Sequence, residues 1–446
     1  MKSLNFGLKS FAYSLFALAG LFIVGSAISQ QIGLDGGFYL AVARNLWEDG
    51  YNYFDIASSY NPLGIMILGL PNLLLDNPVQ INYLLYFFIL IIDTILFYHV
   101  CVYYRKDQPQ SLLISAVFLL YALLLDGHLI ILEPIQLLFI FISILFTHRK
   151  QYLLVGLTLF CAFLTKQYSL ALIVPICLII IQEGNAAKQK LIQLTSVCFI
   201  FFAALVAFYW LYAPMFSFEY YLLRLLGQVP QMKGILSNTI GTGEGYNITV
   251  FAKTLFKIIL FFPLMWLPLI TFQKNKANFN LLITILSFSS VFIFAAYYHY
   301  FLLILPWMLI LLHQNLDLNK IKIHRFFYIL ILLPTLFLFL KTARNKYIIS
   351  VQENALSETL KSYIPKDSKV YIVNLSMAQY AHCDFNSIDN NTIGYTFPNV
   401  IKKEAILSAM TSGSFLIADL NYLDNKERQQ YLIVSNKEEY VIYKKK

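Results

Sequence analysis

The sequence predicts a polytopic α-helical membrane protein with about eleven transmembrane helices and a small α/β domain at its carboxyl-terminal end. Of its 446 residues, 59% are hydrophobic and only 13% are charged, whereas about a quarter of the residues of a soluble protein are charged. Apolar runs recur at lengths that cross a hydrocarbon layer of roughly 30 Å. After about Asn345 the pattern changes to alternating charged and apolar residues, which is typical of a soluble domain.

The first predicted helix follows a basic amino-terminal stretch and includes the apolar run Phe11–Ile28. A cleaved signal peptide is one interpretation, because small residues (Gly25-Ser26-Ala27) stand near the end of the run. An uncleaved span is favoured, because the run is long and further spans follow it.

The apolar runs predict spans at residues 10–29, 80–104, 111–126, 130–147, 151–164, 169–183, 191–213, 250–272, 279–297, 300–313 and 326–341. The apolar segment after Pro62 is too short to cross and is interrupted by Pro71. It is therefore predicted to be an interfacial or re-entrant helix.

The distribution of Lys and Arg predicts the orientation. With the amino terminus in the cytoplasm, alternating spans place thirteen of these residues in cytoplasmic segments and four (Arg44, Lys166, Arg224 and Lys233) in outer loops before the tail. This bias is typical of a multi-pass protein of the inner or plasma membrane, here with an extracytoplasmic carboxyl-terminal domain. The net charge of +9 therefore reflects basic residues that set the orientation in the membrane. The expected partners are membrane lipids, and no nucleic acid is expected to bind.

The first outer loop, residues 30–62, is the most informative segment of the sequence. Loops of this length usually bind or react, and its many aromatic residues indicate packing at a membrane surface. Asp35 is the candidate for the acid that does the chemistry, although it is equally suited to cap a helix that starts near Phe38. Asp55 is a weaker candidate, because it also suits the start of a turn.

The predicted topology puts Glu133 and Lys166 on the same side as this loop. An ionisable residue at membrane depth is costly, so both are candidate site residues. The alternatives are that Glu133 complements the dipole of a helix amino terminus and that Lys166 reaches the membrane surface. His128 and His299 fit turn or interface histidines better than metal ligands, and no metal-binding motif is present.

Lys253 and Lys257 lie one turn apart near the outer end of the eighth predicted span. The favoured interpretation is that both side chains extend along the helix and place their ammonium groups at the membrane surface. Contact with an anionic head group is the alternative.

The first outer loop resembles the catalytic loop of C-type membrane glycosyltransferases, in the branch of the protein mannosyltransferases and the aminoarabinose transferase. The resemblance rests on Asp35 followed by the stretch that contains Tyr39, on Asp55 and on Asn61-Pro62. Many members have an acidic pair where this chain has Asp35-Gly36, so a metal bridged by two carboxylates is not expected. No cofactor is required by these motifs, and a divalent cation is left open.

Three later segments add to the resemblance. Glu133-Pro134 is similar to the second acidic position of the family, and Leu164-Thr165-Lys166 is similar to its Leu-Thr-Lys segment. Tyr300 with Pro306 is similar to the aromatic–proline span near the end of its membrane domain. Each motif is weak alone, but their order and their common side make the combination fairly specific.

The resemblance implies a C-type transferase domain at residues 1–343, an extracytoplasmic domain at 344–446, and a sugar donor linked to polyprenyl phosphate. The acceptor is a lipid, a glycan or a protein. Such a reaction needs a base for the acceptor hydroxyl and charge stabilisation for the departing phosphate. The expected catalytic residues are Asp35 and Glu133, and the expected substrate-binding residues are Lys166, Asp55, Tyr39, Asn61, His299 and Tyr300.

Two other classes of protein remain open. A lipid or glycan transporter would show internal repeats and broken helices near the midplane, whereas the polar residues here gather at one membrane surface. A polysaccharide polymerase would also place polar residues in outer loops, so the sequence separates it poorly from a transferase.

The tail predicts a small α/β domain. Its elements are expected as helices at 351–363 and 401–410 and strands at 369–373, 414–418 and 440–443.

Overall fold

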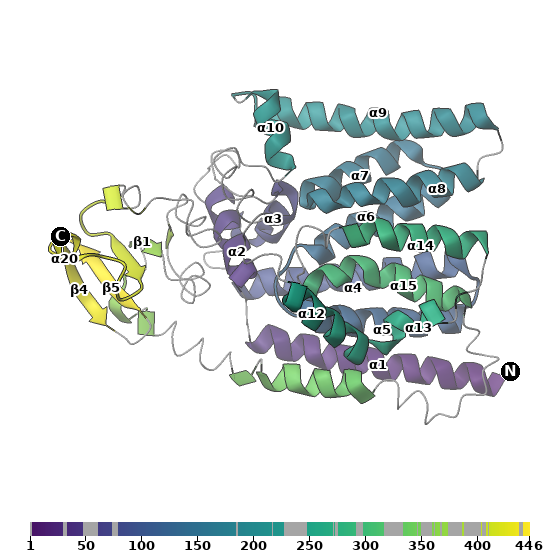
Figure 1. Ribbon diagram of the computed structural model, residues 1–446, viewed down its shortest axis with the longest axis horizontal. Helices are drawn as coiled ribbons and strands as arrows, with labels where there is room; N and C mark the ends of the chain where they lie inside the picture. The colour runs from purple at the N-terminus through teal and green to yellow at the C-terminus, as the bar shows by residue number, and fades with distance from the viewer. Residues whose placement is uncertain are drawn as a thin grey trace. The chain divides into compact units, whose positions relative to one another are not determined.

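The structure is a computed structural model in which most of the described chain is helical (Figure 1). The described residues are 2–29, 34–47, 61–73, 79–183, 186–215, 217–226, 248–270, 272, 275–290, 298–315, 333–345, 347–348, 359–360, 362–365, 368–372, 386–387, 403, 407–408, 410–436 and 440–446. Contacts within the chain divide it into two compact units. The first comprises Met1–Ile28, Tyr86–Pro214 and Asn238–Asn345, and the second comprises Ser29–Leu85, Met215–Ser237 and Lys346–Lys446.

The first unit is a bundle of helices that run alongside one another (Figure 1). Its helices are α1 (Lys2–Ser29), most of α4 (Val79–Tyr104), α5 (Gln108–Ala122), η2 (Leu123–Gly127), α6 (Glu133–His148), α7 (Tyr152–Thr165), η3 (Gln167–Leu172), α8 (Ile173–Glu183), α9 (Ala187–Tyr212), α12 (Ile248–Phe261), α13 (Pro263–Ile270), α14 (Lys276–Ser289), η6 (Tyr298–Tyr300), α15 (Phe301–Asn315) and the helix 333–345.

Small residues and polar contacts fix the packing of the bundle. Helix α7 packs on α6 and α9, and a side chain at Gly156 would lie 2.6 Å from the Val197 carbonyl oxygen, so only glycine allows this close approach. Helix α15 packs on α5, α13 and α14. At its end the carbonyl oxygen of His313 accepts hydrogen bonds from Arg105 Nη1 at 2.9 Å and Gln110 Nε2 at 3.0 Å.

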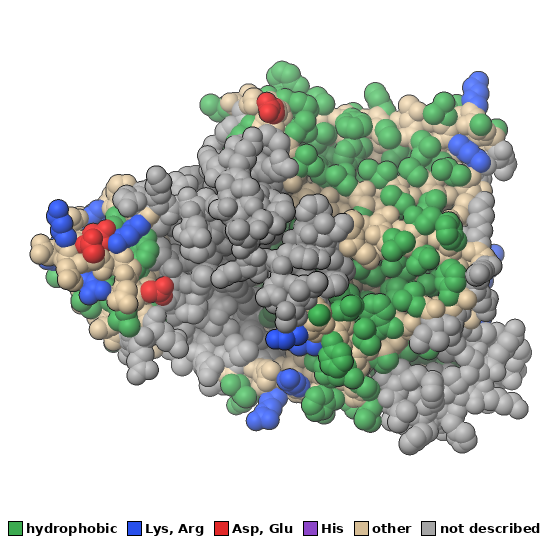
Figure 2. Space-filling view, viewed as in Figure 1, with side chains coloured by type: hydrophobic (Ala, Val, Ile, Leu, Met, Phe, Trp, Pro, Cys, Tyr) green, Lys and Arg blue, Asp and Glu red, His purple; other side chains and the backbone are tan. Residues whose placement is uncertain are grey.

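The structure confirms a helical architecture with several membrane-length helices. Among the described residues, four helices are long and apolar enough to cross a bilayer: Gly7–Ile28, Ile81–Tyr104, Gln108–Gly127 and Ala187–Tyr212. The pair Ala252–Phe261 and Pro263–Leu269 passes the same test together but is bent by 92°, and other apolar helices are shorter. The predicted count of eleven spans is therefore not confirmed. Hydrophobic side chains cover much of the visible face of the bundle (Figure 2).

The second unit contains α2 (Leu34–Trp47), α3 (Pro62–Leu68), η1 (Leu70–Leu73) and α10 (Phe218–Leu225). The Trp47 indole donates a hydrogen bond to the Met66 carbonyl oxygen at 3.0 Å, and α2 packs directly against α3. The seven residues of α3 agree with the prediction that the segment after Pro62 is too short to cross. The expected helix start near Phe38 is wrong, because α2 begins at Leu34.

The carboxyl-terminal part of the second unit forms a five-stranded sheet in the order β2-β1-β3-β5-β4. The strands are β1 (Lys369–Ile372), β2 (Asn386–Ser387), β3 (Phe415–Ala418), β4 (Tyr431–Asn436) and β5 (Val441–Lys445), with the short helix α20 (Asn425–Arg428) before β4. β1 pairs in parallel with β2 and β3, whereas β5 pairs antiparallel with β3 and β4.

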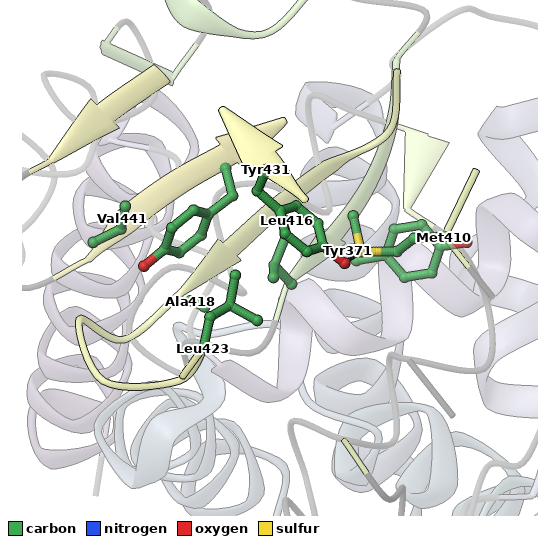
Figure 3. Packing of buried hydrophobic residues seen from close by; sticks show 8 residues of the cluster. Tyr371, Met410, Leu416, Ala418, Leu423, Tyr431 and Val441 are labelled. Atoms are coloured by element: carbon green, nitrogen blue, oxygen red, sulfur yellow. Dashed lines mark hydrogen bonds between the residues drawn. The ribbon is translucent and has the colours of Figure 1, made fainter. Parts of the chain in front are cut away.

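Each face of this sheet carries its own hydrophobic cluster. One cluster contains Leu360, Val370, Phe415 and Ile442, and the other includes Tyr371, Met410, Leu416, Ala418, Leu423, Tyr431 and Val441 (Figure 3). The three predicted strands are present, but β2 and β4 were not predicted. Most of the predicted helices 351–363 and 401–410 lies outside the described residues.

Candidate functional site

The first element of the site is the irregular turn that interrupts the helix after α5. The π-helical turn η2 contains Asp126, whose backbone adopts the left-handed region with φ of 65° and ψ of 2°. A side chain at the next residue, Gly127, would lie 2.3 Å from the Ala122 carbonyl oxygen, so the turn requires glycine there. His128 follows and its Nδ1 hydrogen-bonds the Leu123 carbonyl oxygen at 2.9 Å. Together these contacts end the helix and hold Asp126 at the end of the bundle.

Glu133 is the first residue of α6, with a proline directly after it. This position suits a carboxylate, because the unpaired N–H groups at a helix amino terminus favour negative charge. Proline is tolerated there because its missing N–H would have no intrahelical partner. The Glu133 side chain is nevertheless fully buried, so the dipole alone does not compensate for the loss of its hydration.

Lys166 lies in a second break, between α7 and η3. Its backbone is extended, with φ of −157° and ψ of 133°. Gln136 of α6 braces this break, because its Nε2 donates to Ser169 Oγ at 2.7 Å and to the Lys166 carbonyl oxygen at 3.4 Å. Ser169 Oγ in turn donates to the Ala162 carbonyl oxygen at 2.7 Å. These hydrogen bonds hold the chain at the interruption and fix the direction of the lysine.

The Lys166 ammonium forms a salt bridge with Glu133 Oε1. Lys166 is 2% exposed and Glu133 is 0% exposed, so the two charges compensate each other where water does not reach. The ammonium also lies 5.0 Å from the centre of the Tyr300 ring and 5.9 Å from that of Tyr168. Both distances allow cation–π attraction.

His299 joins this pair to Asp126. Its Nε2 lies 3.7 Å from Glu133 Oε1, and its Nδ1 lies 4.0 Å from Asp126 Oδ2. Tyr300, the next residue, places its hydroxyl 3.4 Å from that of Tyr168. Asp126, Glu133, Lys166, His299 and Tyr300 therefore form one cluster, which we call the acid–lysine cluster.

The acid–lysine cluster has a buried part and an accessible part. Glu133 Oε2 is buried and has no hydrogen-bond partner among the described residues, so it can accept a hydrogen bond from a ligand. The Asp126 side chain is 32% exposed and that of His299 is 13% exposed, so these two groups can meet solvent or a ligand. A cation, two carboxylates and an imidazole within contact distance can bind an anion and transfer a proton.

In the part of the chain that the structure describes, no group of three or more His, Cys, Asp or Glu residues has an arrangement that would hold a metal ion.

Half of the sequence-predicted site residues meet in this cluster, namely Glu133, Lys166, His299 and Tyr300. The others belong to the second unit. There Tyr39 is buried in α2, and Asn61 is buried directly before α3. Asp35 lies in the first turn of α2, but its side chain is outside the described residues, as is the whole of Asp55. The predicted meeting of Asp35 with Lys166 remains a prediction.

Asp126 was not predicted as a site residue. The signal that identifies it is the tight turn Leu125-Asp126-Gly127-His128 between two apolar runs, on the same predicted side as Glu133. Aspartate tolerates the left-handed backbone better than most residues, and glycine after it marks a sharp change of direction.

Comparisons with known proteins support the resemblance at the level of fold. No protein-family model matches the chain, and no curated protein sequence matches it. Among solved structures, ArnT from Cupriavidus metallidurans bound to undecaprenyl phosphate has a TM-score of 0.60 at 11% identity over 96% of this chain and 97% of that chain. The apo state of the same protein has a TM-score of 0.54 at 12% identity over the same shares. The chain thus has a fold similar to that of ArnT over nearly its whole length.

Proposed function

We propose that this protein is an integral-membrane glycosyltransferase that moves a sugar from a polyprenyl-phosphate donor to an acceptor hydroxyl at the extracytoplasmic face. The observation that carries the proposal is the buried Glu133–Lys166 pair beside Asp126 and His299, in a fold similar to ArnT. Undecaprenyl phosphate bound to ArnT supports a donor of the same class here.

In this reaction the bond between the anomeric carbon and the phosphate oxygen breaks, and the electron pair leaves with the phosphate. A new bond forms between the anomeric carbon and the acceptor oxygen, whose proton passes to a carboxylate. A phosphate is a fair leaving group, so the enzyme has most to gain from stabilising its developing charge and from taking the acceptor proton.

Lys166 is the group that we assign to the phosphate. Its ammonium is held by Glu133 and by the Tyr300 ring, so it is already oriented before a ligand binds. Glu133 pairs with the Lys166 ammonium where water does not reach. Glu133 Oε2, which has no hydrogen-bond partner among the described residues, can orient the acceptor. His299, Tyr300, Tyr39, Asn61 and Asp55 complete the proposed substrate-binding set.

Two carboxylates are candidates for the base. Asp35 is the choice from the sequence, because it lies in the first outer loop, residues 30–62, which resembles the catalytic loop of C-type membrane glycosyltransferases. Asp126 is the accessible carboxylate of the acid–lysine cluster, and His299 lies beside it. Asp35→Asn and Asp126→Asn separate the two assignments, because removal of a general base costs about 10²–10⁴-fold in rate.

The orientation is part of the proposal. The amino terminus is cytoplasmic, and the carboxyl-terminal domain from residue 344 is extracytoplasmic, where we assign to it selection of the acceptor or coverage of the site. The domain boundaries at 343 and 344 and the catalytic loop at 30–62 come from the sequence. Cysteine accessibility at exposed positions such as Lys9 and Lys426 tests the sidedness directly.

Transfer is tested with the purified full-length protein in vesicles. Polyprenyl-phosphate donors carrying a labelled hexose, pentose or amino sugar are supplied one at a time, and loss of donor and release of polyprenyl phosphate are measured. Comparison of envelope glycolipids, glycans and glycoproteins from cells with and without the protein then identifies the acceptor. The proposal predicts donor consumption by the wild type and none by Lys166→Ala.

The competing functions have different outcomes in the same experiment. A transporter would move the intact labelled lipid across the vesicle without cleaving its phosphate bond. A polymerase would form products of increasing length. Either result, without single transfer, would overturn the proposal.

A further inference from the structure

Four exposed cations gather on one helix pair outside the acid–lysine cluster. Lys253 and Lys257 are exposed on α12, and Lys341 and Arg344 are exposed on the helix 333–345. None of the four forms an ion pair with a carboxylate in the described part of the chain. We call these four residues the basic patch.

The two helices are neighbours in the first unit. Thr335 Oγ1 donates to the Phe261 carbonyl oxygen at 2.8 Å, and the Phe261 and Phe337 rings stack at 6.4 Å. Figure 1 shows α12 and the helix 333–345 approaching the same end of the bundle, and Figure 2 shows Lys and Arg side chains gathered over that end beside hydrophobic surface.

The basic patch lies at the end of the bundle where the acid–lysine cluster lies. Phe22 of α1 contacts His128 at the η2 break, with ring centres 5.7 Å apart, and it contacts Phe339 at 4.9 Å. Phe339 is therefore level with the break after α5, and Lys341 and Arg344 follow it along a helix that rises about 1.5 Å per residue. Lys341 and Arg344 thus lie at the level of the break after α5 or beyond it.

The four cations of the patch repel one another. Lys253 and Lys257 are four residues apart, and Lys341 and Arg344 are three residues apart, so each pair shares one face of its helix. Like charges at these spacings destabilise a helix. Two such pairs on adjacent helices add to the repulsion, which an anion between them would relieve.

The surface below the patch is suited to lipid chains. On α12 the exposed side chains include Phe256, Ile259 and Leu260, and on the neighbouring helix they include Phe337 and Leu340. Exposed apolar side chains of this size belong in the hydrocarbon layer of a bilayer. Long basic side chains at the edge of such a surface reach the head groups.

We propose that the basic patch binds the head groups of anionic phospholipids in the leaflet at the end of the bundle that carries Glu133 and Lys166. The partner is expected to be anionic because the four cations form no ion pair with a described carboxylate, and to carry acyl chains because apolar side chains are exposed beside them. Each Lys or Arg near an anionic surface strengthens binding about fivefold. The patch therefore distinguishes an anionic phospholipid from a zwitterionic one.

The test uses the full-length protein in vesicles of phosphatidylcholine that contain a photoactivatable phosphatidylglycerol with the reactive group in its acyl chain. Adducts are mapped by mass spectrometry to peptides from α12 and the helix 333–345. In the wild type, labelling of these peptides by the phosphatidylglycerol probe should exceed labelling by the matching phosphatidylcholine probe at least about tenfold. Raising the ionic strength should reduce only the phosphatidylglycerol labelling.

Variants of the basic patch test whether its four cations cause the preferential labelling by phosphatidylglycerol. The fourfold variant Lys253→Gln, Lys257→Gln, Lys341→Gln and Arg344→Gln should lower labelling by phosphatidylglycerol to the level of phosphatidylcholine. The variant Lys253→Arg, Lys257→Arg and Lys341→Arg should keep the wild-type labelling, because the charge is retained. A matched control removes four cations elsewhere in the first unit, by Lys9→Gln, Arg149→Gln, Lys188→Gln and Lys190→Gln, and should leave the mapped adducts unchanged.

Two results would overturn the proposal. One is equal labelling of the wild type by the two probes, which needs no variant to interpret. The other is wild-type labelling of the fourfold glutamine variant by phosphatidylglycerol. Transfer activity plays no part in either result, so the lipid site and the proposed function fail independently.

Discussion

Lys166 pairs with one oxygen of Glu133, and both side chains lie inside the helix bundle with almost no exposure to solvent. Thirty-three residues separate them in the sequence. They meet because α6 starts at Glu133 and because α7 ends in an extended residue at Lys166. The pair leaves the second oxygen of Glu133 without a partner among the described residues, which gives the site one unfilled acceptor.

Removal of one member of this pair should destabilise the protein strongly. Glu133→Gln leaves a buried ammonium without its counter-charge, and Lys166→Met leaves a buried carboxylate without its counter-charge. Each variant should therefore lower the free energy of unfolding by about 3–5 kcal/mol. The measurement is the unfolding midpoint of the purified protein in detergent. The double variant should recover much of this loss, because no buried charge remains, but it should not transfer sugar. Additive losses in the double variant would show that the two side chains do not compensate each other.

Most residues of the acid–lysine cluster could be predicted from the sequence, but the contacts between them could not. Glu133, Lys166, His299 and Tyr300 are recognisable because polar groups are rare and costly among apolar runs. Their convergence was inferred only as a common membrane side, because sidedness does not say which loops touch. Asp126 was missed as a site residue because a single aspartate before glycine is common in turns.

The carboxyl-terminal domain shows a second limit of sequence reasoning. β1, β3 and β5 are short apolar runs bounded by polar residues, and all three were predicted. β4 was missed although its sequence, Tyr431–Asn436, is rich in β-formers. It is an edge strand with a bulge between Ile433 and Ser435, and Leu432 and Ile433 are exposed, so it lacks the regular burial pattern of a central strand.

The turn that positions Asp126 should not tolerate a side chain at Gly127. In Gly127→Ala the new methyl group would lie 2.3 Å from the Ala122 carbonyl oxygen, so the π-helical turn must shift and Asp126 must move with it. We expect a lower unfolding midpoint and a loss of transfer, both measured on purified protein. Gly25→Ala is the matched control, because a methyl group there meets no atom within 4 Å. It should be neutral or stabilise α1 by up to about 1 kcal/mol, and equal behaviour of the two variants would contradict the geometry.

Asp93 should weaken the bundle rather than support it. This residue is fully buried in α4, and neither carboxylate oxygen has a hydrogen-bond partner among the described residues. Asp93→Val removes both unsatisfied oxygens and should raise the free energy of unfolding by about 1–3 kcal/mol. Asp93→Asn keeps two polar atoms at the site and should gain little. A lower unfolding midpoint for Asp93→Val would mean that the carboxyl group has a stabilising partner.

The short helix α20 should depend on pH through Asp424. The Asp424 carboxylate accepts hydrogen bonds from the backbone N–H groups of Glu427 and Lys426, each at 2.8 Å. The N–H of Glu427, followed by that of Lys426 and by nearby lysine charges, holds the pKa of Asp424 below its ordinary value. A lowered pKa means that this cap contributes fully above the unfolded value of about 3.9 and is lost as the pH falls through the lower folded value.

Hydrogen exchange of the peptide that contains α20 measures this contribution in the full-length protein. At neutral pH, Asp424→Ala should increase exchange at Lys426 and Glu427, because both N–H groups lose their acceptor. Asp424→Asn should preserve protection, because asparagine is an equally good cap, and its protection should no longer respond to acid. An acid response in Asp424→Asn equal to that of the wild type would assign the titration to another group, with Glu427 as the first candidate because its carboxylate accepts the Asp424 N–H at 2.8 Å.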